Sequence, residues 1–465
     1  MKPKGAGHAA AAACALAASL ALFWPGTALF DSVEQYRQAV SGIVADWHPP
    51  VMARLWGALA RVWPGTGPML VLQLGLYWIG LGLLATALAR RGRRAAGWAV
   101  LVVGTAPILS CWMGAILKDA QLLGALAAAT GIAAWHPLSE QRRPAWATAA
   151  ILILLLYATL VRANAVFATA PLALALLGWP RLHKVRWRVA ACLALIVGVI
   201  LLTPLANHRL FGAEREGPEN SLLLYDIAGT SIRAGTDSAG VSAAKWRALA
   251  AGGCYSPLEW DAFSEPGRCT IGAGLAAQPE TPPLYGIWRQ TIARHPIAYA
   301  AHRLAHFNLT MRFLAGTNEP RAVAPVDSEP NRLGIGAEPS AIERAWQESG
   351  LLWAATPLAW PILWLGLAAV GLWASRSAPE TPERRLAQAL LLSACCGGLS
   401  YAVVSVAPDL RYHLWTILAS GLGLVLLACT GGIARRHLAV GGAVIGVVIV
   451  TGTAARLLLP AFTVS

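Results

Sequence analysis

The sequence predicts an all-α polytopic membrane protein. Of its 465 residues, 56% are hydrophobic and only 13% are charged, and the hydrophobic residues occur in long runs. Such a composition is far more apolar than that of a soluble domain. The formal net charge of +14 comes from small Lys and Arg clusters between the apolar runs. Clusters in these positions are typical of orientation signals in membrane proteins, so we expect no nucleic-acid partner.

The apolar runs predict about eleven transmembrane helices, because a span needs about 20 apolar residues. Residues 9–30 could be a signal peptide after Lys2 and Lys4, but the length of the run and its Trp24-Pro25 step favour a retained first span. The expected spans are approximately 9–30, 68–89, 95–112, 119–136, 145–161, 164–179, 189–207, 350–374, 386–406, 412–432 and 438–459.

The basic clusters predict the orientation of these spans. If the N-terminus is cytoplasmic, the clusters at 90–94, 142–143, 181–188, 376–385 and 435–436 all fall on the cytoplasmic side, as the positive-inside rule requires. The opposite side then receives a first outer loop, 31–67, and an insertion, 208–349. We therefore divide the chain into an N-terminal transmembrane module (1–207), a small outer domain (208–349) and C-terminal transmembrane helices (350–465).

The first outer loop has the pattern of helices lying along a membrane surface. Asp31, Gln35, Gln38 and Gly42 recur at helical spacing and predict one polar face. After Pro49-Pro50, a second segment places apolar residues opposite arginines, which is typical of an interfacial helix.

Asp31 directly beyond the first span, the step His48-Pro49-Pro50 and the late segment 408–412 (Pro-Asp-Leu-Arg-Tyr) together resemble the GT-C superfamily of membrane glycosyltransferases. Bacterial aminoarabinose transferases and protein O-mannosyltransferases are the most similar in appearance, although Ser32 follows Asp31 where those families usually show Asp-Glu. The resemblance implies a polyprenyl-phosphate-linked sugar donor and a lipid, glycan or protein acceptor. It also implies sugar transfer with inversion at the outer face of the bacterial plasma membrane.

Two acidic residues are candidates for catalysis under this resemblance. Asp31 is the candidate base that takes the acceptor proton, and its alternative role is that of an N-cap for the surface helix. Asp46 could bind the acceptor, the donor sugar or a divalent cation, or it could be a solvated loop residue.

Lys118, Arg162 and Arg411 are candidates for binding the donor phosphate. Each is a single cation at the end of a different span in a short outer turn, and an anionic headgroup would need such cations to converge. Each could instead extend along the membrane boundary without a further role. Asp119 either orients Lys118 or forms a salt-bridged turn with it.

Asn164 and Tyr412 could add hydrogen bonds to the same ligand. His48 could reach the phosphate, carry a proton near its ordinary pKa of about 6.5, or pack beside the two prolines. These residues complete the predicted site.

The insertion supplies two further patterns. Cys254 and Cys269 lie 15 residues apart, and in an oxidising periplasm they could form a disulfide. His302 and His306 have the i, i+4 spacing of metal ligands, but no Glu follows the first His as it does in HExxH, so surface or packed histidines on an amphipathic helix are expected.

Two other classes of function stay open. A lipid-linked glycan polymerase or ligase would use Arg and His of late loops and would not need Asp31. A transporter would place ionisable residues or broken helices near the middle of the bilayer.

Overall fold

The computed structural model describes residues 5–178, 184–263, 269, 284–317 and 321–461. Over these residues the secondary structure is helical, and the only β pairing is three isolated bridges. The helices fall into two compact units, of which the first comprises 1–215, 322–398 and 410–450 and the second comprises 216–321, 399–409 and 451–465.

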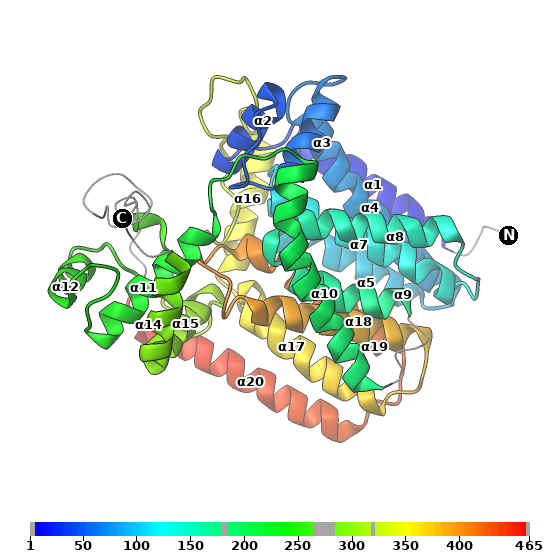
Figure 1. The fold of residues 1–465 in the computed structure, drawn as a ribbon. Helices are drawn as coiled ribbons and strands as arrows, with labels where there is room; N and C mark the ends of the chain where they lie inside the picture. Colours follow the sequence, from blue (N-terminus) through cyan, green and yellow to red (C-terminus); the bar gives the residue numbers. More distant parts are fainter. Residues whose placement is uncertain (1–4, 179–183, 264–268, 270–283, 318–320, 462–465) are drawn as a thin grey trace. The chain divides into compact units, whose positions relative to one another are not determined.

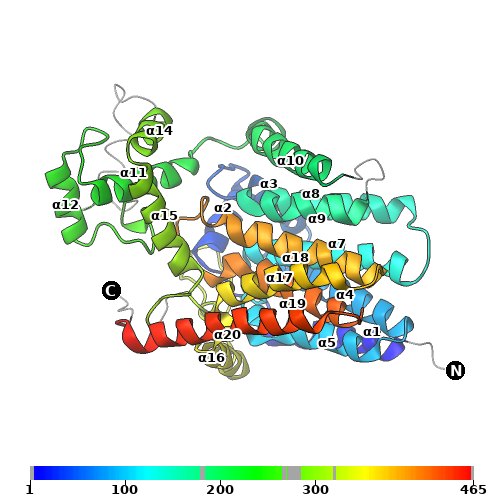
Figure 2. The same cartoon turned by 90° about the horizontal axis from the view of Figure 1, so that it is seen from below.

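The first unit is a bundle built on α4, α7 and α8, with α1, α5 and α19 packed around them (Figures 1 and 2). Its helices, counting α18 and α20, which extend past its borders, are α1 (Ala6–Phe23), α2 (Phe30–Ser41), α3 (Pro50–Ala60), α4 (Gly67–Arg90), α5 (Arg94–Thr105), α6 (Pro107–Met113), α7 (Lys118–Leu138), α8 (Ala145–Val161), α9 (Val166–Leu177), α10 (Val185–Leu205), α16 (Ala341–Ala354), α17 (Pro361–Ala374), α18 (Pro382–Ser400), α19 (Leu414–Ala428) and α20 (Arg435–Leu458).

Several of these helices are suited to a lipid environment, which makes the chain a multi-pass membrane protein. Among the described residues, five helices are long and apolar enough to cross a membrane, or six if α5 and α6, which meet at a 57° bend, form one span. In α10 no residue is buried, and its exposed side chains include Leu193, Leu201 and Leu202. Water disfavours such a surface, whereas lipid accommodates it.

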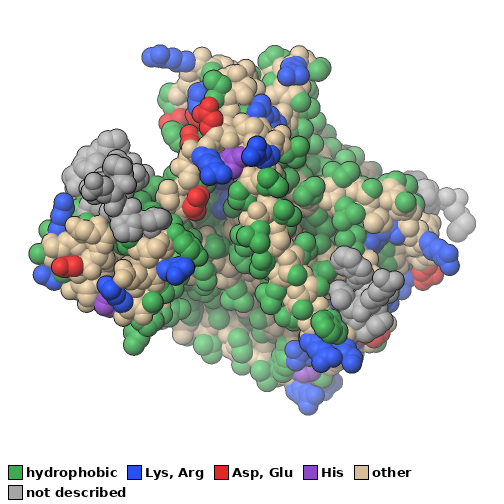
Figure 3. Space-filling model, viewed as in Figure 1, with side chains coloured by type: hydrophobic (Ala, Val, Ile, Leu, Met, Phe, Trp, Pro, Cys, Tyr) green, Lys and Arg blue, Asp and Glu red, His purple; other side chains and the backbone are tan. Residues whose placement is uncertain are grey.

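The count of about eleven spans stays a prediction. Each predicted run overlaps a helix or a helix pair, but α8 and α9 have only 17 and 12 residues. On the face of the bundle shown in Figure 3, hydrophobic side chains cover much of the length of the helices, and charged side chains gather mainly toward their ends.

Small residues allow α4 and α7 to approach closely along their length. A Cβ added at Gly124 would lie 2.7 Å from the Gln73 carbonyl oxygen, and Gly131 packs directly against the backbone of Gly80. Close backbone contact at glycines is a common basis of helix association within membranes.

At one end of the bundle, ion pairs connect charged residues at the ends of α4, α7 and α18. Arg91, just after α4, lies 2.8 Å from Glu140 after α7 and 2.6 Å from Glu383 at the start of α18. These three helix ends therefore share one end of the bundle, as expected if they share one side of the membrane.

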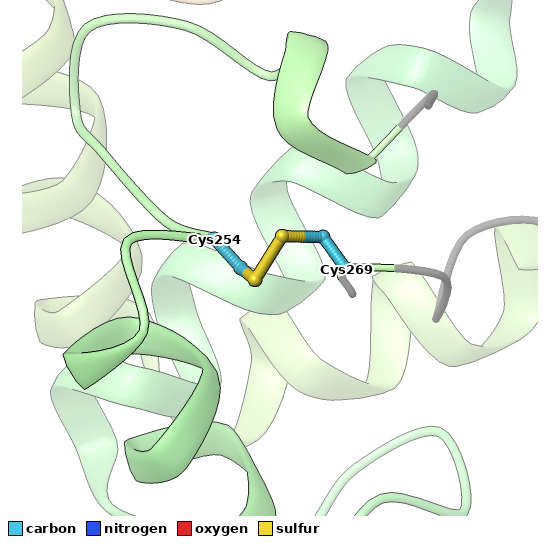
Figure 4. The surroundings of a disulfide bond; sticks show 2 residues. All are labelled: Cys254 and Cys269. Carbon is cyan, nitrogen blue, oxygen red and sulfur yellow. A yellow bond between two sulfur atoms is a disulfide. The ribbon is translucent and has the colours of Figure 1, made fainter. Parts of the chain in front are cut away.

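The second unit packs α11 (Glu219–Ala234) against α12 (Ala243–Ala251), α14 (Leu284–Arg294) and α15 (Pro296–Thr310). Its small core contains Trp246, Phe263 and Ile287. Cys254 and Cys269 are joined in a disulfide (Figure 4). Residues 322–349, which the sequence analysis placed in the outer domain, belong to the first unit.

Candidate functional site

The short segment before α7 is fixed from two sides, which positions Lys118 and Asp119. The buried Gln73 of α4 donates hydrogen bonds from Nε2 to the carbonyl oxygens of Met113 (2.7 Å) and Ala115 (3.0 Å). From the other side, Ser32 Oγ donates to the Ile116 carbonyl oxygen at 2.6 Å. Ser32 therefore holds the start of α2 against the start of α7.

Asp31, next to Ser32 in the first turn of α2, lies between two cations from distant parts of the sequence. Its Oδ2 atom is 3.3 Å from Lys118 Nζ and 3.3 Å from Arg411 Nη1. The N-cap of α2 is Leu29, and Asp31 lies inside the helix. The alternative interpretation of Asp31 as an N-cap is therefore wrong.

Asp119 forms the second carboxylate of this cluster. It is 2% exposed, forms an ion pair with Arg162, and lies 3.8 Å from Arg411 Nε through its Oδ2 atom. Lys118 and Asp119 thus have different partners. The prediction that they form a salt-bridged turn is therefore wrong, and so is the prediction that Asp119 orients Lys118. Successive side chains at a helix start point about 100° apart, which explains the difference.

Arg162 is oriented by two residues that the sequence also predicts at this site. Asn164 Oδ1 accepts a hydrogen bond from Arg162 Nε at 2.9 Å. The guanidinium lies 4.0 Å from the centre of the Tyr412 ring, within the range of a cation–π interaction. Asn164 and Tyr412 therefore support a cation in the cluster.

Three cations and two carboxylates give this ion cluster, defined as Asp31, Lys118, Asp119, Arg162 and Arg411, a net charge of +1. Burial alone would raise the pKa of Asp31, but the charges of Lys118 and Arg411 outweigh it and hold the pKa well below the usual range. The cluster thus has an ionised carboxylate and an excess of positive charge that suits an anion.

His48 lies in the electrostatic field of the cluster and is 3% exposed. Burial and the charge of Lys118 lower its pKa to about 4, more than Asp31 and Glu34 raise it. The imidazole is therefore neutral at pH 7, and the prediction of a proton carrier near pH 6.5 is wrong. Among the described residues, neither ring nitrogen has a hydrogen-bond partner.

Gln35 belongs to the predicted polar face of α2 but not to the predicted site residues. It follows Asp31 by one turn of α2 and is fully buried, and neither atom of its amide has a hydrogen-bond partner within the described part of the chain. The only available signal was its i, i+4 spacing from Asp31, which places both on one helix face. Buried amides without partners are rare in proteins and often mark functional regions.

Asp46 belongs to a different set of contacts. Its carboxylate lies 3.4 Å from His208 Nε2, its backbone N–H donates to the Glu214 carbonyl oxygen, and its side chain is 11% exposed. Asp46 thus lies in a loop, partly buried and with partners of its own. Over residues that the structure describes, no group of three or more His, Cys, Asp or Glu is arranged to hold a metal ion.

His302 and His306 are fully buried on α15, so they are packed histidines and not the surface histidines that the sequence left as the alternative. His302 Nδ1 is 2.9 Å from Tyr255 Oη, and His306 Nδ1 is 2.9 Å from the Pro257 carbonyl oxygen. Both therefore bond to protein groups of the second unit.

No family model, curated protein or solved structure matches this chain. The resemblance to GT-C glycosyltransferases consequently depends on Asp31, His48-Pro49-Pro50 and the segment 408–412.

Proposed function

We propose that this protein is an inverting membrane glycosyltransferase that moves a sugar from a polyprenyl-phosphate donor to an envelope acceptor at the outer face of the bacterial plasma membrane. The observation that carries the proposal is the position of the Asp31 carboxylate, 3.3 Å from both Lys118 and Arg411. A carboxylate beside converging cations is the arrangement that proton removal and phosphate departure require together.

The chemistry divides between the two kinds of side chain. The acceptor hydroxyl oxygen attacks the anomeric carbon, the bond from that carbon to the phosphate oxygen breaks, and Asp31 receives the hydroxyl proton. Lys118, Arg162 and Arg411 balance the charge that develops on the leaving phosphate, and bidentate contacts from arginine suit a phosphate especially well.

The low pKa of Asp31 makes it a weak base as long as both cations contact it. A donor phosphate would compete for Lys118 and Arg411, and a weaker contact with these cations raises the pKa of a carboxylate. Donor binding thus prepares Asp31 for its role, and we expect the donor to bind before proton transfer.

The proposal is tested by comparing envelope glycolipids and polysaccharides from cells with the protein, without it, and with Asp31→Asn. We expect one hexose, pentose or amino-sugar mass to disappear in the last two samples. Asp327→Asn is the matched control, because Asp327 pairs with Arg344 on an exposed surface. An unchanged glycan profile in the Asp31→Asn cells, at equal protein level, would favour a polymerase, ligase or transporter.

A further inference from the structure

α15 directs its polar residues inward and its apolar residues outward. His302 and Arg303 are 0% and 4% exposed, whereas Ile297 and Leu304 are 84% and 64% exposed. Ile297, Ala301 and Leu304 follow one another at helical spacing and form one apolar stripe on α15. An uncovered apolar stripe indicates contact with an apolar partner.

The inward polar face is occupied by contacts within the second unit. Asp226 of α11 lies 2.6 Å from Arg303 and 3.4 Å from His302, and it accepts a hydrogen bond from Trp288 Nε1 at 2.8 Å. The packing of α11, α14 and α15 thus uses the polar face of α15. The apolar stripe takes no part in these buried contacts and is available to a ligand.

A basic cavity of about 860 Å³ opens beside the start of this stripe. Its wall contains Arg233 at the end of α11 and Arg294 and His295 at the junction of α14 and α15, and Ile297 and Ala301 of the stripe also line it. None of the described residues that line it is acidic. Figure 3 shows basic and hydrophobic side chains together on the surface of the second unit.

The cavity and the stripe together select one chemical class of ligand. The volume is within the range of about 300–1,000 Å³ that is usual for ligand pockets. Two guanidinium groups in a wall whose described residues include no carboxylate suit a phosphate, which arginine can bind through paired hydrogen bonds. From Ile297 to Leu304 the stripe extends about 10 Å, at about 1.5 Å per helical residue. It can therefore support part of an acyl chain attached to that phosphate.

We propose that this cavity holds the phosphate headgroup of one anionic lipid, whose acyl chain lies along Ile297, Ala301 and Leu304. Inorganic phosphate would use the arginines and leave the stripe uncovered, and a neutral lipid would leave the arginines without a counter-charge. The proposed function leaves lipid, glycan and protein acceptors open. If that function holds, this site favours a phosphorylated lipid as the acceptor to test first.

The test uses the full chain in a neutral detergent, with retained lipid measured by native mass spectrometry. We expect one phosphatidylglycerol molecule to be retained at concentrations at which phosphatidylcholine is lost. Arg233→Ala combined with Arg294→Ala should weaken phosphatidylglycerol binding by about thirtyfold, since each basic residue near an anionic lipid contributes about a factor of five. Ile297→Ser combined with Leu304→Ser should also weaken it.

The matched control is Lys245→Ala combined with Arg247→Ala, which removes the same charge from exposed positions on α12. It should leave binding unchanged, and thermal unfolding should show that all variants are folded. Equal affinity for phosphatidylcholine, unchanged binding by the folded arginine variant, or full displacement of the lipid by inorganic phosphate would overturn the proposal. Asp31→Asn should keep this lipid, so failure of the lipid site and failure of the proposed function are separate outcomes.

Discussion

Replacing Asp31 by Asn should make the protein bind polyprenyl phosphate more tightly while it loses sugar transfer. The substitution removes one of the two carboxylates of the ion cluster, so the net charge of the cluster changes from +1 to +2. Lys118 and Arg411 then lack the negative group that lies 3.3 Å from each of them. The shape of the side chain is nearly unchanged.

The size of this effect follows from the distances in the cluster. One additional positive charge about 4 Å from a phosphate monoanion contributes about 4 kcal/mol at an effective dielectric constant of about 20. The side chains of Asp31, Lys118 and Arg411 are 18%, 19% and 15% exposed, so water and salt screen part of this energy. We therefore expect about tenfold tighter binding, which corresponds to about 1.4 kcal/mol.

The assay is a titration of undecaprenyl phosphate into the full chain in neutral detergent, followed by native mass spectrometry. It is carried out with Arg233→Ala and Arg294→Ala in both proteins, so that the cavity of the second unit does not contribute. Asp327→Asn provides the control for loss of a carboxylate elsewhere. Weaker or unchanged binding by a folded Asp31→Asn protein would refute the competition between Asp31 and the phosphate.

Three further predictions concern the framework of the site. Ser32→Ala removes the hydrogen bond that holds the segment before α7. It should lower the free energy of unfolding by about 1–3 kcal/mol and weaken binding of polyprenyl phosphate, whereas equal binding would show that this bond does not position Lys118. Gly131→Val should reduce the folded, monodisperse fraction after purification because its side chain meets the α4 backbone, and Gly446→Val, in open space on α20, should not. In the wild type, thermal stability should fall as the pH is lowered from 6.5 to 4. The pKa of His48 is about 4 in the folded protein and about 6.5 in the unfolded chain, so the unfolded chain binds a proton that the folded protein does not. This difference is worth about 3 kcal/mol. His48→Gln should flatten that decline, and an unchanged pH profile would contradict the assignment.

The sequence located helices well where an apolar run ends at charged residues. The predicted spans 68–89 and 119–136 correspond to α4 (Gly67–Arg90) and α7 (Lys118–Leu138). The sequence predicted interruptions within helices poorly, because hydropathy carries no information about backbone hydrogen bonds. The run 95–112 bends at Ala106-Pro107, and the run 350–374 is interrupted before Pro361. Proline lacks the N–H that a continuous helix needs, so these breaks were readable in principle.

The sequence also indicated which charges could converge, but not how they would pair. Lys118, Arg162 and Arg411 were each expected near one ligand, and they share one cluster with Asp31 and Asp119. Pairing depends on the direction of each side chain and on what packs against it, which spacing along the chain does not contain. For the same reason the sequence could not show that Ser32 would hold two helix starts together.

The orientation of α2 connects these observations with the membrane. Its polar residues Gln35 and Gln38 are buried, while Phe30 and Val40 are 68% and 52% exposed, and Ile43, just beyond the end of the helix, is 59% exposed. In water this orientation costs free energy, because apolar area remains hydrated while polar groups lose their water. At a lipid boundary the same orientation is favourable, since the apolar residues enter the acyl region and the polar residues stay buried within the protein. α15 is inverted in the same way. Both α2 and α15 thus combine buried polar groups on one face with exposed apolar side chains that suit lipid, as the proposed action on amphipathic substrates at a membrane surface would require.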